Sequence, residues 1–278
     1  MPTVQPVVAT RPASEATVNE DAVALGPGVA VLVDGAGLPA SMRRGCRHSV
    51  AWYATELATA FRDALSDRAV RPAEALAAAL TAVAASHGPG CDLGRGSPSG
   101  TVAAWRTSGD RLEHLVLGDA TVLLAAVDGV VTVVTDDRLA RVVEPVVRAF
   151  VDERRDRGLV PSRDEILDAR RAALERTRNR SGGFWCAHAD HAAAAEALTG
   201  SVPRDAVAGV VVASDGATRG YEHLGVHAPD DVVRRSLAGD GATVIGEIRA
   251  AERSTTLFTD VAMKPHDDAT LVAWRLLP

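Results

Sequence analysis

The chain has 278 residues, of which 47% are hydrophobic and 24% are charged, and this composition excludes wholesale disorder. Its 36 acidic and 30 basic side chains give a formal net charge of −6 without a basic block, so we expect no nucleic-acid partner. No apolar run approaches the roughly 20 residues that a membrane span requires, and the first residues lack the apolar core of a secretion signal. We therefore expect no membrane partner and a cytoplasmic location.

The first part of the chain predicts a lead-in, one strand and two helices. Residues 1–16 are polar and contain proline, so we expect a flexible N-terminal lead-in before a single domain over residues 17–278. Residues 28–33 form a short apolar run between turn signals, which is typical of a buried strand. Residues 46–65 carry apolar side chains at steps of three and four, and residues 72–86 are rich in alanine after an opening proline; both patterns predict helices.

Strands dominate the middle of the chain. Residues 87–100 are rich in glycine, proline and serine and predict a loop. Four short apolar runs follow, separated by turn signals: 101–107, 112–117, 121–127 and 130–135. This spacing is typical of antiparallel strands and not of alternating strands and helices. Residues 141–180 are charged and helical in period, with a break at Pro161 and a capping box formed by Ser162 and Glu165.

The last third predicts a strand, two helical stretches and a closing strand. These lie at residues 206–214, 230–251 and 269–277. The whole order therefore runs strand, helices, antiparallel strands, helices and strand. It predicts an α+β fold in which sheets pack as a sandwich with helices outside, built as one domain.

Carboxylates stand at the ends of several apolar runs. Asp34 and Asp215 each follow a predicted buried strand, and Asp119 lies at the break between two short strands. Two acidic pairs directly precede apolar runs: Glu20-Asp21 and Asp267-Asp268. Because a strand end places a side chain rigidly at the rim of a sheet, these positions are candidates for a ligand site.

Each carboxylate also has a simpler interpretation. Four aspartates precede a glycine, at positions 34, 128, 215 and 240, and Asp-Gly is a common hairpin turn. Asp128 lies between two strand runs and is interpreted as a turn, and Asp240 lies between helical stretches and is interpreted as a loop or a cap. Taken singly, Asp34 and Asp215 favour a turn as well, and an acidic pair before a strand is usually solvated.

If these carboxylates lie together in the fold, a metal site becomes a better interpretation than separate turns. If several strand ends converge, four or five carboxylates come close together, and like charges at that distance cannot all ionise without cations. Oxygen ligands without histidine suit Mg²⁺ or Mn²⁺ and not Zn²⁺. Two such ions about 3.5–4 Å apart are a known device for phosphoryl transfer. The sequence does not itself show the convergence.

The three cysteines, Cys46, Cys91 and Cys186, are widely spaced and form neither a CxxC pair nor a disulfide framework, which fits a reducing cytosol. Cys186 stands close to His188 and His191, a pattern that invites a zinc interpretation. No second Cys/His pair follows at zinc-finger spacing, so we interpret these residues as structural or surface groups.

Six short segments in order resemble the metal-dependent protein phosphatase 2C family, also called PPM, in its bacterial type. They lie at residues 19–22, 33–37, 99–103, 117–120, 213–216 and 267–272. The resemblance implies a four-layer α-β-β-α sandwich with two central antiparallel sheets flanked by helices. It also implies hydrolysis of phosphoserine and phosphothreonine esters with two Mn²⁺ or Mg²⁺ ions. The partners implied are a phosphorylated protein substrate and a serine/threonine kinase in a signalling system.

The resemblance also implies roles for particular residues. Asp34 would bridge both ions, and the Gly35 carbonyl would bind the second. Asp215 and Asp267 would complete the ligands of the first ion, so that Asp34, Asp215 and Asp267 act catalytically through a metal-activated water. A hydroxide shared by the two ions would attack phosphorus in line, and no protein nucleophile is required.

Further residues complete the implied site. Glu20 would hold the second ion through water, with Asp21 in the same acidic group. Asp119, together with Asp215, matches a third, looser metal site that some members show. Residues of about 141–182 would form the variable flap that shapes substrate choice.

One position departs from the family pattern. Members carry an arginine four residues before the first glutamate, where it grips the substrate phosphate, and this chain has Ala16 there. Arg11, Arg43 and Arg44 are candidates to replace it. The departure leaves two alternatives to a phosphoprotein phosphatase: a pseudophosphatase-type module that binds phosphoproteins, and a phosphatase for small phosphate esters.

Overall fold

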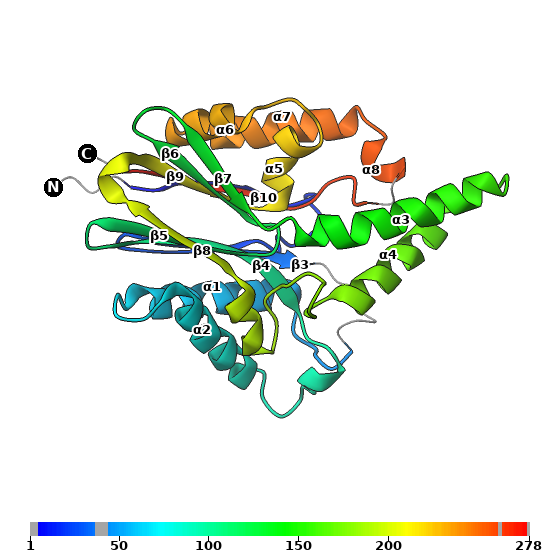
Figure 1. Cartoon of the computed structure of the whole chain (residues 1–278), viewed down its shortest axis with the longest axis horizontal. Helices are drawn as coiled ribbons and strands as arrows, with labels where there is room; N and C mark the ends of the chain where they lie inside the picture. The colour runs from blue at the N-terminus through cyan, green and yellow to red at the C-terminus, as the bar shows by residue number, and fades with distance from the viewer. Residues whose placement is uncertain (1–4, 37–43, 261–262, 277–278) are drawn as a thin grey trace.

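The structure, a computed structural model, describes residues 5–36, 44–260 and 263–276. Their strands form two five-stranded antiparallel sheets that lie face to face (Figure 1). The first sheet has the order β1 (Val7–Arg11), β10 (Ala269–Arg275), β9 (Val207–Ala213), β6 (Thr121–Ala126) and β7 (Val131–Thr135). The second has the order β2 (Ala22–Gly26), β3 (Val29–Ala36), β4 (Ser99–Ser108), β5 (Arg111–Leu117) and β8 (Leu198–Pro203).

Helices cover both outer faces and one end of the sandwich (Figure 1). The second sheet is covered by α1 (Val50–Ser66) and α2 (Pro72–Ser86). The first is covered by α5 (Asp215–Glu222), α6 (Pro229–Leu237) and α7 (Gly241–Arg253). A flap of α3 (Arg138–Asp156) and α4 (Arg163–Thr177) projects from one end, and α8 (Leu257–Asp260) follows α7. Short 3₁₀ turns lie at Leu93–Arg95, His191–Glu196 and Arg204–Ala206. The predicted four-layer sandwich is confirmed.

The alternation of side chains along β3 shows how the layers are held. Val29, Val31 and Val33 pack into the core shared with α1 and α2. Ala30 and Leu32 point the other way, into the core between the two sheets. Successive side chains of a strand face opposite sides, so the next residue, Asp34, falls on the face between the sheets.

Both predicted helices after β3 are present, and α1 shows why they form. Tyr53, Leu57, Phe61 and Leu65 are buried on one face of α1. Ser49 caps its N-terminus by accepting a hydrogen bond from the Trp52 backbone N–H at 3.0 Å. The helix begins at Val50, four residues after the predicted start at 46, because the Ser49 cap marks the first helical turn.

The prediction of a flexible lead-in over residues 1–16 is wrong for residues 7–11. These residues form β1 and pair with β10 over five positions, from Val7 opposite Ala273 to Arg11 opposite Ala269. The edge of β10 offers unpaired backbone groups that a short segment can satisfy. The first sheet therefore begins upstream of residue 17.

One further strand, β8, escaped the sequence analysis because its side chains are largely exposed and none is buried. It lies at an edge of the second sheet, and an edge strand needs no alternating apolar pattern. The apolar run after Glu20-Asp21 forms β2, the other edge of that sheet, in which Ala24 is buried. No helix of the described residues combines the length and the apolar character that a bilayer crossing requires.

The flap matches its prediction closely. The break at Pro161 separates α3 from α4, and α3 begins three residues before the predicted 141. The capping box is present: the Glu165 N–H donates to Ser162 Oγ, and the Ser162 N–H donates to Glu165 Oε2 at 2.8 Å. Val143, Ile166 and other apolar residues give the flap a small core of its own, which includes Phe184.

Candidate active site

Asp34 lies within β3 and does not form a turn. It pairs with Thr101 of β4, and Gly35 pairs with Gly100. A Cβ at Gly35 would fall 2.6 Å from the Glu20 carbonyl oxygen, so only glycine lets the first acidic motif approach this strand. The sheet register therefore brings Glu20 beside the end of β3.

Asp215 joins Asp34 from the other sheet. It is the first residue of α5, directly after β9, and its backbone N–H donates to Asp34 Oδ2 at 3.1 Å. The preceding Ser214 accepts a hydrogen bond from the Thr270 N–H of β10 at 2.8 Å. The two sheets thus meet at this pair of carboxylates.

Asp268, to which the sequence analysis gave no role, holds the segment that carries Glu20 and Asp21. Its carboxylate accepts hydrogen bonds from the backbone N–H groups of Ala13 and Glu20, each at 2.7 Å. It is 8% exposed, so these bonds satisfy buried carboxyl oxygens. Asp268 therefore ties the segment before β2 to the segment before β10.

Asp267 is held by two cations. Its Oδ1 lies 2.9 Å from Lys264 Nζ, and its Oδ2 lies 3.2 Å from Arg219 Nη2. Arg219 is itself buried and also pairs with Glu252. Sequence reasoning missed both cations, although Lys264 is the only lysine and stands three residues before Asp267.

Asp21 and Asp119 complete the group. Thr270 Oγ1 donates to Asp21 Oδ2 at 2.7 Å, while Asp21 Oδ1 is buried and has no hydrogen-bond partner among the described residues. Asp119 follows Gly118 at the end of β5, and its carbonyl accepts from Thr135 Oγ1 at 3.4 Å. We call Asp21, Asp34, Asp119, Asp215 and Asp267 the acidic cluster.

The carboxylates of the acidic cluster raise one another's pKa values. Burial, and then the charges of Asp215 and Asp21, raise the pKa of Asp34 well above its usual value. Burial is also the main cause that raises the pKa of Asp21 and of Asp119 to about 7. The pKa of Asp215 rises to about 6 through burial and Asp267, against the opposing effect of Arg219. These shifts show that the side chains share one electrostatic environment.

The acidic cluster fits divalent cations by its chemistry. It offers carboxylate oxygens, one of which is buried and has no hydrogen-bond partner in the part of the chain that the structure describes, and its charges repel in the absence of a counter-charge. Such oxygens suit Mg²⁺ or Mn²⁺. Among the described residues, only one group of three or more His, Cys, Asp or Glu side chains has all its ligand atoms within 4.8 Å of one another. That group is separate from the acidic cluster. The carboxylates of the acidic cluster are more widely spaced than that.

The candidates for the missing arginine lie in different places. Arg43 is outside the described residues, and Arg44 is exposed. Thr10 faces the acidic cluster, because its Oγ1 lies 2.7 Å from Thr270 Oγ1. Alternation along β1 turns Arg11 to the opposite face, where Arg11 Nη1 would lie 4.0 Å from a Cβ on Gly246 of α7. Ala16 itself is exposed.

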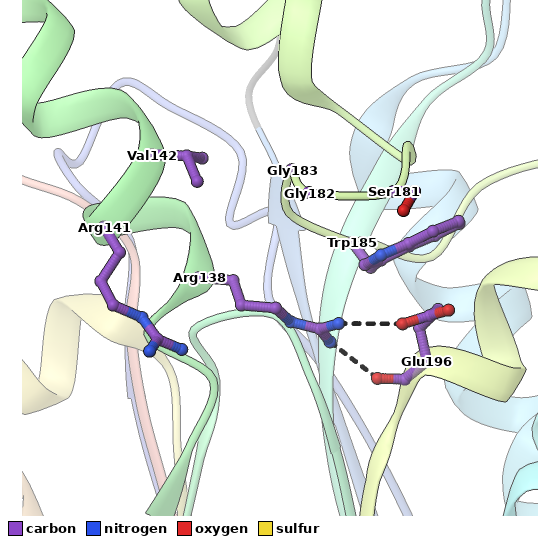
Figure 2. Close-up of a pocket in the computed structure, with 8 residues that line it drawn as sticks. All are labelled: Arg138, Arg141, Val142, Ser181, Gly182, Gly183, Trp185 and Glu196. Atoms are coloured by element: carbon purple, nitrogen blue, oxygen red, sulfur yellow. Dashed lines mark hydrogen bonds and ion pairs between the residues drawn. The ribbon is translucent and has the colours of Figure 1, made fainter.

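A pocket of about 300 Å³ lies between the start of α3 and the loop after α4 (Figure 2). Its lining includes Arg138, Arg141, Val142, Ser181, Gly182, Gly183, Trp185 and Glu196. Arg138 crosses the pocket and donates to Glu196 at both the side chain, 3.1 Å, and the carbonyl, 2.7 Å (Figure 2). A Cβ on Gly118 would lie 3.5 Å from the Trp185 carbonyl oxygen, so the pocket adjoins the segment that carries Asp119.

No protein-family model and no curated protein matches the sequence. Solved structures do match the fold. The Mycobacterium tuberculosis serine/threonine phosphatase PstP/Ppp is 18% identical, with a TM-score of 0.56 and 97% of each chain covered. The catalytic domain of PstP in complex with two manganese ions gives 18% identity, a TM-score of 0.55 and the same coverage. Stp1, a serine/threonine phosphatase from Staphylococcus aureus, is 11% identical with a TM-score of 0.55, over 99% of this chain and 96% of the other.

These similarities extend over nearly the whole chain. At such identities they show the fold alone, which is that of phosphatase 2C-type serine/threonine phosphatases. The resemblance expected from the six short segments is confirmed at the level of the fold.

Proposed function

We propose that the chain is a metal-dependent serine/threonine protein phosphatase of the phosphatase 2C type, a hydrolase of phosphate monoesters. The observation that carries the proposal is the acidic cluster, in which Asp34 of one sheet and Asp215 beside the other are joined by a hydrogen bond. The fold supports it, because similar structures are those of serine/threonine phosphatases and one of them holds two manganese ions.

The residues that would hold the ions are those the resemblance assigns. Asp34, Asp215 and Asp267 would bind the first ion, and Asp34, the Gly35 carbonyl and Glu20 the second, with Asp21 beside them. Asp119 and Asp215 would bind a third, looser ion. When bound, Mn²⁺ or Mg²⁺ lowers the pKa of a coordinated water and neutralises charge on phosphoryl oxygens.

The chain's own groups position this set of ligands. Asp268 holds the backbone of Glu20 through its carboxylate, and Gly35 leaves the space that this approach needs. Lys264 and Arg219 hold the Asp267 carboxylate in place through an ion pair to each of its oxygens. No serine, cysteine or histidine is needed as a nucleophile in this scheme.

We further propose a phosphorylated protein as the substrate, and a serine/threonine kinase as the enzyme that supplies it, in the cytoplasm. The pocket beside the flap supports a peptide substrate, because it lies next to Asp119 and presents the exposed Arg141. None of the three cysteines forms a disulfide in the described part of the chain, as a reducing compartment favours.

The test measures hydrolysis of p-nitrophenyl phosphate, a phosphoserine peptide, a phosphotyrosine peptide and sugar phosphates, each with Mn²⁺, with Mg²⁺ and with EDTA. We expect turnover that requires a divalent ion and is fastest on the phosphoserine peptide. Turnover should fall at least about 100-fold in Asp34→Asn. Asp128→Asn, which removes an exposed carboxylate from the β6–β7 turn, is the matched control and should keep full activity. Turnover that is indifferent to metal or to Asp34→Asn would contradict the proposal.

A second candidate function is a pseudophosphatase-type module that binds phosphoproteins. Two observations favour it: Ala16 stands in place of the phosphate-binding arginine, and both oxygens of Asp267 are paired with cations. Saturable binding of a phosphoserine peptide without release of phosphate over hours would support this function and exclude the first.

A further inference from the structure

A second cluster of metal-ligating side chains lies away from the acidic cluster. It consists of Cys46, His48, His87 and Cys91, which come from two loops about 40 residues apart in sequence. His48 directly precedes Ser49, the N-cap of α1, and His87 is the C-cap residue of α2. The antiparallel packing of these helices brings the two loops together.

The four ligand atoms surround a space of the size of one metal ion. Cys46 Sγ lies 3.6 Å from Cys91 Sγ, 3.3 Å from His48 Nδ1 and 3.2 Å from His87 Nδ1. Cys91 Sγ lies 3.4 Å from His48 Nδ1, and all four atoms lie within 4.8 Å of one another. Zinc bonds of about 2.3 Å to sulfur and 2.0–2.1 Å to nitrogen place tetrahedral ligands about 3.4–3.8 Å apart. The observed separations are close to these.

The surroundings hold the ligands in place. The Trp52 ring stacks on His48 with centroids 4.0 Å apart and meets the His87 ring edge-on at 4.9 Å. The two loops are also joined by backbone bonds, from the Asp92 N–H to the Gly45 carbonyl at 2.7 Å and from the Gly45 N–H to the Gly96 carbonyl at 3.2 Å. A side chain at Gly45 would collide with the Asp92 carbonyl, so glycine is needed for this approach.

We propose that Cys46, His48, His87 and Cys91 bind one Zn²⁺ ion in a closed, tetrahedral, structural site. Two thiolates and two imidazoles are a set that selects zinc, whereas the oxygen ligands of the acidic cluster select harder ions. Four protein ligands leave no open position for a substrate, so the ion has a structural and not a catalytic role. The spacing Cys-x-His and His-x₃-Cys is visible in the sequence, but only the fold pairs the two halves.

The site links two loops that flank Asp34. One follows β3 and leads to α1, and the other runs from α2 to β4, the strand that pairs Thr101 with Asp34. A bound ion would therefore fasten both connections of this strand pair, as structural zinc fastens loops that lack a core of their own. The proposal does not depend on the phosphatase activity.

The first test is the metal content of the whole chain, purified with a reducing agent and passed through metal-free buffer. We expect about one zinc per chain, with X-ray absorption showing two sulfur and two nitrogen neighbours. Replacement by Co²⁺ should give the visible bands of a tetrahedral thiolate site. A chain that holds no zinc and takes none up on reconstitution would overturn the proposal, as would a Cys46–Cys91 disulfide in the purified protein.

Variants locate the ion. Cys91→Ser and His87→Gln should each lower zinc occupancy at least about tenfold. The matched controls, Cys186→Ser and His191→Gln, alter the same residue types outside the cluster and should retain zinc. Asp34→Asn should also retain zinc while losing phosphatase activity, which separates this proposal from the proposed function. Equal zinc in Cys91→Ser and the unmodified chain would overturn it.

Discussion

Among single residues, Asp267 is the member of the acidic cluster whose carboxylate forms ion pairs with two cations. Lys264 and Arg219 each take one of its carboxylate oxygens, at 2.9 Å and 3.2 Å. Any divalent ion that binds Asp267 must compete with these two cations, because like charges near one carboxylate repel. Lys264 is the more exposed of the two and the easier to change without disturbing the core.

We predict that Lys264→Gln tightens the binding of Mn²⁺, since it removes a positive charge beside the site. Isothermal titration calorimetry of the metal-free chain measures the effect as a lower Kd. Arg111→Gln, which removes a positive charge from the turn end of β5, is the control and should leave the Kd unchanged. A weaker affinity in Lys264→Gln would mean that Lys264 supports the site instead of competing with it.

A second prediction concerns pH. Burial, followed by Asp215, raises the pKa of Asp119 from 3.8 to about 7, so the folded chain holds a proton there that the unfolded chain releases. Without metal, Asp119 therefore costs stability as pH rises from about 4 to about 7. Asp119→Asn lacks this loss, and its stability advantage should grow over that range by at most about 4 kcal/mol.

Urea unfolding at several pH values in EDTA measures this advantage. Asp128→Asn, which removes an exposed carboxylate, is measured beside it. If the stability difference between Asp119→Asn and the unmodified chain is flat from pH 4 to pH 7, Asp119 is not in a shared acidic environment.

Sequence reasoning could find the residues of the acidic cluster but not their partners. Asp34 and Asp215 follow apolar runs, a position that a simple turn also explains, so it is the ordered set of acidic motifs that selects them. The bond from the Glu20 N–H to Asp268 spans 248 residues, and no local pattern encodes it. The second cluster, of Cys46, His48, His87 and Cys91, was missed for the same reason, because its two halves stand in separate loops whose pairing depends on how α1 packs on α2.

At the scale of elements, the flap is the part whose stability rests most on local signals. The capping box of Ser162 and Glu165 begins α4, in which only Ile166 and Ala173 are fully buried. We predict that Ser162→Ala destabilises α4 by about 1 kcal/mol, because it leaves backbone N–H groups of the first turn unpaired. Hydrogen exchange of α4 amides measures this loss, and Ser162→Thr, which keeps the cap, should restore protection. Unchanged exchange in Ser162→Ala would show that packing against α3 alone holds the helix.

The pocket beside the flap carries a prediction about substrates. Arg141 is exposed at its rim and pairs with Asp137 on the surface of α3. We predict that Arg141→Glu raises KM for a phosphoserine peptide with acidic flanks and leaves the rate on p-nitrophenyl phosphate unchanged, because only the peptide reaches the pocket. Steady-state kinetics on both substrates provides the measurement. An equal change on both substrates would mean that Arg141 affects the site as a whole and does not contact the peptide, which contradicts the prediction.

Most of the elements that the sequence predicted have a buried face, and the exception, the edge strand β7, was marked by the turn signals around it. The apolar stripe of α1 and the apolar run of β3 each pack against a core. Burial requires apolar side chains at these positions, and their spacing is the pattern that sequence analysis detects. β1 and β8 lie at sheet edges and are mostly exposed, so their place depends on backbone pairing with β10 and β5. Backbone pairing leaves no mark on the side-chain pattern.

In the whole molecule, the acidic cluster lies where the two sheets meet at one rim. Asp34 belongs to the second sheet and Asp215 to the helix that leaves the first, and 181 residues separate them. The order of strands and helices predicted the sandwich, but the meeting of these two side chains depends on the register of both sheets. A cation bound between them would join the sheets and offset the repulsion that raises their pKa values.

The most direct test is anomalous diffraction from crystals of the chain grown with Mn²⁺. Our account predicts two manganese peaks at the rim between the sheets, both within bonding distance of the Asp34 carboxylate and one also bound by Asp215. Crystals that show ordered Asp34 and Asp215 side chains at saturating Mn²⁺ and no anomalous peak beside them would contradict it.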